Sequence, residues 1–359
     1  MHRWPGCGAC RAVTVAGIVA AMPVIVVRDL VKRYHRSKRI TGRWGALRTL
    51  LTRQHEVVCA VDGIGFDIEP GEMVAYLGPN GAGKSTTVKL LCGILTPTSG
   101  TVVVAGARPW FDRVRNARQI GVVFGQRSQL WWDLPLRDSL ELVGRLYEVH
   151  PARYRENLRR FTELLQMSAF LDTPVRQLSL GQRMRGELAA AMMHEPRILY
   201  LDEPTIGLDV LARDRIRTFI RELNRDRGVT VILTTHDLTD VERLCHRLLL
   251  IDNGRLLHDG DLASLKAAFP AYRQLVVRMP ECARAPDLAG VEVSPRGDGN
   301  WVLRFDPAAV NVAELVGTVL SRYPVTDLSI LEPSLEDVVH RLYGSASPDV
   351  RPAGETQPA

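Results

Sequence analysis

The chain has 359 residues, of which 46% are hydrophobic and 24% charged, and its net charge is +6 at neutral pH. This length accommodates two globular domains, and this composition excludes an intrinsically disordered chain or one that crosses the membrane many times. Six scattered cysteines lack the spacing of a disulfide framework, which favours a reducing compartment such as the cytosol. The mild positive charge favours an acidic partner surface and fits an ordinary solvated surface equally well.

The N-terminal stretch 12–27 is apolar and follows two arginines, so it superficially imitates a signal peptide. It contains Pro23 and is shorter than the roughly 20 residues that a spanning helix needs. Its second half, Val24 to Leu30, has the pattern of a buried strand. We therefore expect the first domain to begin at Met22, with residues 1–21 an extension outside the native fold. Any membrane channel is expected to come from a partner.

From residue 22 to 269 the chain alternates strand patterns with helical patterns, which predicts an α/β domain. Several strands are apolar throughout, as expected for central strands that are covered on both faces. The clearest predicted strands are Met73–Leu77, Ile120–Phe124, Ile198–Leu201, Thr230–Thr234 and Leu248–Ile251.

Residues 35–58 interrupt this alternation as a basic insertion. Arginines and lysines are interleaved there with Trp44, Leu47, Leu50 and Leu51 at helical spacing. Such a helix could lie on anionic headgroups or against the cytosolic end of a channel. A peripheral helix with a solvated basic face explains the same pattern equally well.

Beyond Pro270 the pattern changes to a compact α+β unit, which we place at 270–344. Strands are predicted at 274–279, 291–293, 301–305 and 325–331, and helices at 312–321 and 335–342. The last residues, 345–359, are rich in Pro, Ser and Ala, which predicts a disordered tail.

A glycine-rich loop follows the predicted strand 73–77 and opens a helical run at 87–92, the order that a phosphate-binding loop requires. Its glycines let backbone N–H groups converge on phosphates, Lys84 reaches the β- and γ-phosphates, and the Ser85 hydroxyl suits Mg²⁺. The residues expected to bind ATP here are Gly78, Pro79, Asn80, Gly81, Ala82, Gly83, Lys84, Ser85 and Thr86.

The apolar run 198–201 ends in two adjacent carboxylates, Asp202 and Glu203. Because side chains alternate along a strand, this pair can divide its work. We expect Asp202 to hold Mg²⁺ through water or through Ser85. Glu203 is the expected catalytic residue, which orients and polarises the attacking water.

A third motif, Leu178-Ser179-Leu180-Gly181-Gln182, immediately precedes a predicted helix at 183–193. It resembles the signature sequence of ATP-binding-cassette (ABC) ATPases, in that family's order between phosphate loop and carboxylate strand. The resemblance covers roughly residues 24–269 and implies a P-loop NTPase fold: a RecA-like core with an antiparallel β subdomain and a helical signature subdomain. The family usually has glycine at the position of Leu180, whereas Ser179, Gly181 and Gln182 remain to grip a γ-phosphate.

The resemblance also assigns roles to single residues. Gln126 resembles the glutamine that senses Mg²⁺ and the attacking water, and His236 resembles the switch histidine at the γ-phosphate. Asp209 lies in a segment similar to the dimer-contact loop, and Tyr34 is the candidate for stacking on adenine. The family pairs two cassettes head to tail, which implies that each ATP lies between Lys84 of one chain and Ser179 of another.

Two segments bear on the membrane partner. Trp131, Trp132 and Leu134 make the stretch after Gln126 unusually apolar, and in the family this neighbourhood accepts a coupling helix of the membrane subunit. The alternative is that they belong to the core. The stretch 331–339 resembles the C-terminal domain of cassettes from bacterial drug exporters, which favours export.

These observations predict an ATP- and Mg²⁺-dependent ATPase that works with a second cassette and a separate membrane permease, at the cytoplasmic face of the membrane and without nucleic acid. One alternative is a cassette ATPase of chromosome maintenance, repair or the ribosome, and no coiled coil, zinc module or second cassette in the sequence supports it. Another is a P-loop kinase or GTPase, which the signature and His236 oppose. Glu203 opposes a purely regulatory subunit.

Overall fold

The computed structural model describes residues 22–37, 55–125, 128–235, 237–268, 273–280, 285–297, 299–306 and 309–331. Our expectations for residues 1–21, Gln126, His236, most of the basic insertion, the helix 335–342 and the tail lie outside these residues. Within the described ranges, no helix combines the length and the hydrophobicity needed to traverse a bilayer.

The central sheet has the strand order β5-β6-β7-β3-β8-β9. Neighbours from β5 to β8 are parallel, and β9 is antiparallel to β8. The strands are β3 (Met73–Leu77), β5 (Ile120–Phe124), β6 (Ile198–Asp202), β7 (Thr230–Thr234), β8 (Arg247–Asp252) and β9 (Arg255–Asp261). The five predicted strands are therefore confirmed. Since β3, β5, β6 and β7 are parallel, their carboxyl ends lie along one edge of the sheet.

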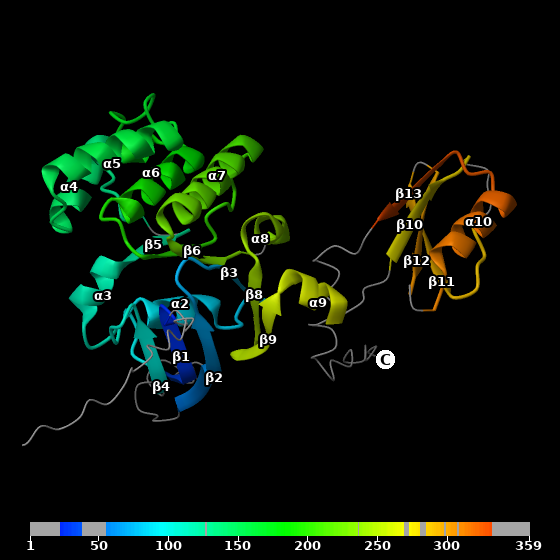
Figure 1. Cartoon of the computed structure of the whole chain (residues 1–359), viewed down its shortest axis with the longest axis horizontal. Helices are drawn as coiled ribbons and strands as arrows, with labels where there is room; N and C mark the ends of the chain where they lie inside the picture. The colour runs from blue at the N-terminus through cyan, green and yellow to red at the C-terminus, as the bar shows by residue number, and fades with distance from the viewer. Residues whose placement is uncertain are drawn as a thin grey trace, which may run out of the picture.

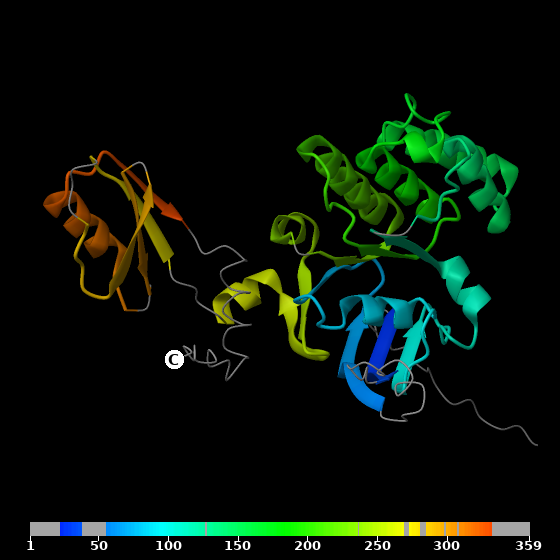
Figure 2. The ribbon, with the colours of Figure 1, turned by 180° about the vertical axis from the view of Figure 1, so that it is seen from behind.

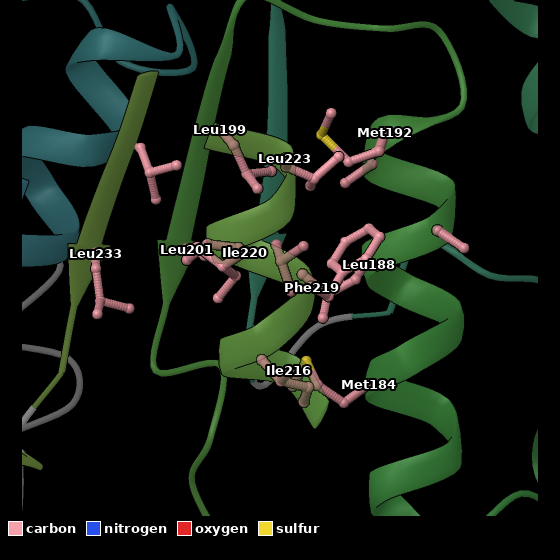
Figure 3. Close-up of a cluster of buried hydrophobic side chains, with 14 of the residues drawn as sticks. Met184, Leu188, Met192, Leu199, Leu201, Ile216, Phe219, Ile220, Leu223 and Leu233 are labelled. Atoms are coloured by element: carbon pink, nitrogen blue, oxygen red, sulfur yellow. The ribbon is translucent and has the colours of Figure 1, made fainter. Parts of the chain in front are cut away.

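Alternate side chains of the central strands enter two different cores. Ala75 and Leu77 of β3 join a cluster formed with the helices, whereas Val74 and Tyr76 join a cluster with the antiparallel strands. Side chains from α6, α7, β6 and β7 meet in the helical cluster (Figure 3). This two-sided burial explains why these strands are apolar at every position.

The helices flank this sheet (Figure 1), and Figure 2 shows them from behind. They are α2 (Lys84–Leu91), α3 (Arg113–Gln119), α4 (Leu136–Leu146), α5 (Pro151–Leu164), α6 (Leu180–Met192), α7 (Val210–Arg227), α8 (Leu238–Leu244) and α9 (Leu262–Ala268). The figures place α4, α5, α6 and α7 together on the side of the central sheet away from β1, β2 and β4.

A second, antiparallel sheet has the order β2-β1-β4, with β1 at Ile25–Ser37, β2 at His55–Ile68 and β4 at Ser99–Val104. Our expected limits of the basic insertion, 35–58, differ from this structure, because Ser37 pairs with His55 and His35 with Val57. Strand pairing is made by backbone hydrogen bonds and does not depend on the side chains. The side-chain pattern of the sequence therefore did not reveal that β1 and β2 extend into the expected insertion. The insertion is thereby narrowed to residues 38–54, outside the described residues.

The C-terminal unit forms a separate antiparallel sheet of order β11-β12-β10-β13. Its elements are β10 (Arg273–Arg278), β11 (Val291–Gly297), β12 (Asn300–Phe305), α10 (Val312–Arg322) and β13 (Asp327–Leu331). Leu315 and Val319 of α10 pack against Leu275 and Leu303 of the sheet. The predicted strands and the helix 312–321 are confirmed here, with ends that shift by a few residues.

His194, between α6 and β6, is held as a neutral ring. It stacks on Tyr147 with ring centroids 3.9 Å apart, and its Nε2 lies 3.0 Å from the carbonyl oxygen of Ile120, to which it donates. Burial lowers the pKa of His194 to about 4 from its ordinary 6.5. The neutral His194 ring therefore makes its full contribution to the free energy of unfolding above pH 6.5. This contribution is lost as the pH falls towards 4, because the unfolded chain binds the proton first.

We expect wild type to lose about 3 kcal/mol more unfolding free energy than His194→Phe between pH 7.5 and pH 4. Phenylalanine keeps the stack on Tyr147 and removes the titrating group. Urea unfolding at a series of pH values measures this difference. Parallel pH profiles of the two proteins would contradict the assignment.

Candidate functional site

The glycine-rich loop connects the carboxyl end of β3 to α2, which begins at Lys84, earlier than the predicted residue 87. Gly83 precedes the helix with φ +105° and Gly81 has φ +87°, both left-handed conformations that favour glycine. A Cβ atom at Gly83 would lie 2.3 Å from the carbonyl oxygen of Ala60. Within the described residues, no side chain caps the N-terminus of α2, which leaves its first N–H groups facing the loop for an anion.

Lys84 curls back over this loop. Its Nζ donates to the carbonyl oxygens of Gly78 at 2.6 Å and Pro79 at 3.0 Å. Partial burial lowers the pKa of Lys84, whereas the nearby carboxylates of Glu203 and Asp202 act to raise it. The loop thus holds a cation within electrostatic reach of both carboxylates.

Asp202 is the last residue of β6 and faces the start of α2. Its Oδ2 accepts a hydrogen bond from Ser85 Oγ at 3.3 Å, and its Oδ1 accepts one from Thr234 Oγ1 at the end of β7. Ser85 and Asp202 therefore present adjacent oxygen atoms, the type of donor that Mg²⁺ prefers. The residues present fit a magnesium ion.

Glu203 adopts a left-handed conformation with φ +56°, which costs a non-glycine residue about 1–3 kcal/mol. Two contacts hold the turn that it begins. The Glu203 N–H donates to the Thr234 carbonyl oxygen at 2.9 Å, and Thr205 Oγ1 donates to the buried Asp240. Asp240 also accepts from Arg217 Nε at 2.6 Å. This buried network anchors the turn to α7 and α8.

The signature motif forms the first turn of α6, which begins at Leu180 and not at the predicted residue 183. Ser179 is the N-cap: its Oγ accepts from Gln182 N at 3.2 Å, and its N–H donates to Gln182 Oε1 at 2.9 Å. Leu180, at the family's glycine position, lies against Gly207, since a Cβ there would be 3.0 Å from Leu180 Cδ2. The signature turn therefore contacts the loop that leads to Asp209.

Asp209 is the N-cap of α7, and its Oδ1 accepts from Ala212 N at 2.8 Å. Tyr34 lies on β1, 37% exposed, with Lys32 Nζ 5.3 Å from its ring centroid. Gln126 and His236 are outside the described residues, and their neighbours Gly125 and Thr235 follow the carboxyl ends of β5 and β7.

The Trp pair is exposed, at 42% for Trp131 and 52% for Trp132, whereas Leu134 is half-buried. The alternative that both tryptophans belong to the core is therefore wrong. Trp132 instead lies on the surface, with the Arg183 guanidinium 5.5 Å from its ring centroid.

Sequence reasoning missed four residues that support the site: Thr234, Thr205, Asp240 and Arg217. Thr205 lies in the turn itself, and the other three hold Asp202 and this turn from β7, α7 and α8. Of these, only Thr234 could have been suspected from the sequence. It ends a buried strand, where its hydroxyl can reach a residue at the end of the neighbouring strand.

Comparisons with known proteins address the family directly. The family model described as ABC transporter matches residues 61–206. A Nod factor export ATP-binding protein I from Paraburkholderia xenovorans is 41% identical over 209 residues, which cover 58% of this chain and 68% of the relative. A protein of the same name from Burkholderia thailandensis is 34% identical over 303 residues, 83% of this chain and 96% of the relative.

The chain belongs to the ABC transporter family. It is the ATP-binding subunit and an ATPase, as the motifs predicted, and a P-loop kinase or GTPase is ruled out. The solved structure of an ATP-binding subunit of an ABC transporter matches with a TM-score of 0.58 and 27% identity, covering 69% of this chain and 93% of that one. A subunit of the cbiONQ ABC transporter complex of Clostridium perfringens matches with a TM-score of 0.55 and 26% identity, covering 68% and 91%. The predicted cassette fold is confirmed.

Replacing Lys84 by alanine should weaken ATP binding by this ABC subunit about 10–100-fold, because a charge-assisted contact to phosphate contributes about 1.5–3 kcal/mol. Lys89→Ala is the matched control, since Lys89 lies in the last turn of the same helix. Titration calorimetry with ATP measures both. Wild-type affinity in Lys84→Ala would remove Lys84 from the site.

Proposed function

We propose that this ATPase powers export through a separate membrane permease and hydrolyses ATP while paired with a second cassette. The observation that carries the proposal is the meeting of Lys84, Ser85 and Asp202 at the carboxyl edge of the sheet, with Glu203 in the next position. The relatives named for Nod factor export support the direction of transport. The cargo is left open.

Each site residue then has a task. The loop 78–86 would bind the phosphates with its N–H groups and Lys84, and Tyr34 would stack on adenine. Ser85, Asp202 and Gln126 would hold Mg²⁺, which neutralises phosphate charge when bound. Glu203 would accept a proton from the attacking water, and His236 would contact the γ-phosphate.

The second cassette would supply Ser179, Gly181 and Gln182 to the γ-phosphate. The apolar residues Ile206, Val210 and Leu211 are exposed around Asp209, beside Leu180 of the signature turn. Exposed apolar side chains grouped at one place favour a protein partner. The dimeric structure of a bacterial ABC transporter cassette, 26% identical with a TM-score of 0.55, supports this pairing.

The permease would contact the exposed Trp131 and Trp132, which favour a protein contact more than a solvated loop. The chain would accordingly lie at the cytoplasmic face of the membrane. We place the cassette at 22–269 and the C-terminal unit at 270–344, on either side of the change from the central sheet to the sheet that begins at Arg273.

Glu203→Gln should still bind ATP and should accumulate as an ATP-dependent dimer, while turnover falls about 10²–10⁴-fold because the general base is lost. Glu222→Gln on α7 is the control with the same change of charge. Phosphate release and light scattering with ATP measure turnover and mass. Hydrolysis at the wild-type rate by Glu203→Gln would defeat the assignment of the base.

Trp131→Ala and Trp132→Ala should each reduce association with the native membranes about 30-fold, the loss of a contact of roughly 2 kcal/mol. ATP affinity of the isolated chain should stay unchanged. Leu320→Ala removes an exposed apolar side chain from α10 and serves as control. Sedimentation of the full chain with membranes measures the effect, and unchanged association of both Trp variants would exclude this surface.

A further inference from the structure

A carboxylate lies inside the helical layer at a position where a helix in a core normally carries an apolar residue. Glu187 is only 4% exposed and sits on α6 between Met184 and Leu188, which are both core residues. A buried ionised carboxylate is costly unless hydrogen bonds compensate its lost hydration. Packing alone would therefore favour an aliphatic side chain here.

Among the residues that the structure describes, the hydrogen bonds that Glu187 makes outside its helix reach one short segment. Its Oε1 accepts from Ser128 Oγ, its Oε2 accepts from Gln129 N at 3.2 Å, and its carbonyl oxygen accepts from Gln129 Nε2 at 3.1 Å. Burial raises the pKa of Glu187, and the bonds from Ser128 and Gln129 oppose that rise. Glu187 thus compensates its burial with bonds to residues 128–129.

The same helix and its neighbour hold the rest of this segment. Arg183, one turn before Glu187, lies 5.5 Å from the ring centroid of Trp132. Trp131 N donates to Ser139 Oγ of α4 at 3.2 Å, and α4 packs against α6. Residues 128–132 are thus attached to the helical layer.

Gly125, the described residue that precedes this segment, is attached to the central sheet. Gly125 N donates to the carbonyl oxygen of Asp202 at 2.9 Å, at the catalytic edge of the sheet. A small cavity of about 50 Å³ separates the two attachments and is lined by Gly125, Ser128, Trp132 and Glu187 together with three further residues. Gly125 is therefore bonded to the sheet, whereas Ser128 is bonded to the helical layer.

We infer that Glu187 is a positioning residue that fixes segment 128–132, with its two exposed tryptophans, to the helix whose first turn is the signature. A displacement of the tryptophans then moves Ser179 and its helix together with them. The inference rests on the proposed function in one respect: that function supplies the membrane permease that contacts the two tryptophans. The attachment itself lies within this chain.

The test compares full-length wild type, Glu187→Ala, Glu187→Gln and Ser128→Ala by amide hydrogen exchange, with and without Mg-ATP. In wild type, ATP should slow exchange in 128–132 and in 179–183 together. In Glu187→Ala, exchange at Gln129 should be about tenfold faster, and ATP should slow only the signature segment. Asn157→Ala is the control, because buried Asn157 bonds to the carbonyl oxygen of Met193 at the far end of α6.

The kinetics of ATP hydrolysis give a second test, because a residue that only stabilises the fold would not change kcat alone. Glu187→Ala should lower kcat severalfold at unchanged KM for ATP, and adding Ser128→Ala should lower it no further because both act through one contact. If Glu187→Ala does not fold, Glu187→Gln and Ser128→Ala carry the same comparison, since both keep the shape of the core.

Two results would overturn the inference: wild-type exchange at 128–132 in the Glu187 variants, or additive effects of the Glu187 and Ser128 substitutions on kcat. These outcomes are distinct from failure of the proposed function. That failure would appear as wild type itself showing no response of the signature segment to ATP.

Discussion

Parallel pairing of β5, β6, β7 and β3 is the constraint on which the rest of this protein depends. Parallel strands end at the same edge, so residues that lie far apart in the chain arrive at one place without any direct attraction between them. Ser85 follows β3, Asp202 ends β6 and Thr234 ends β7, and their side chains are within hydrogen-bond reach there. Backbone pairing therefore builds the site before any ligand contributes.

At this edge the chain accepts conformations and charges that it avoids elsewhere. Glu203 is left-handed, Gly83 fills a position where a Cβ would collide with Ala60, and Lys84 lies partly buried beside two carboxylates. Each feature costs free energy on its own and is held by neighbours, such as Thr205 and Asp240 behind the turn. Such a site suits a highly charged ligand. Phosphate would accept hydrogen bonds from the loop and Lys84, and a divalent cation would bind the oxygen atoms of Asp202 and Ser85.

The helical layer has a different task. Reciprocal hydrogen bonds between Ser179 and Gln182 close its signature turn. The same helix bonds to Ser128 through Glu187 and contacts Trp132 through Arg183. Gly125 remains bonded to the sheet. Through these contacts, the proposed membrane contact at the tryptophans would act on the helix that begins with the signature turn.

The sequence by itself determined the strands, the loop 78–86, the carboxylate pair and the signature, because each is a local pattern that a short stretch of backbone can express. It did not determine that β1 and β2 pair as far as Ser37 and His55, or that Thr234 would hold Asp202. It also gave no sign that Glu187 bonds Ser128, 59 residues away. Those contacts join segments whose separation along the chain carries no periodic signal. Strand pairing brings Ser37 to His55 and Thr234 to Asp202, and the packing of α6 brings Glu187 to Ser128.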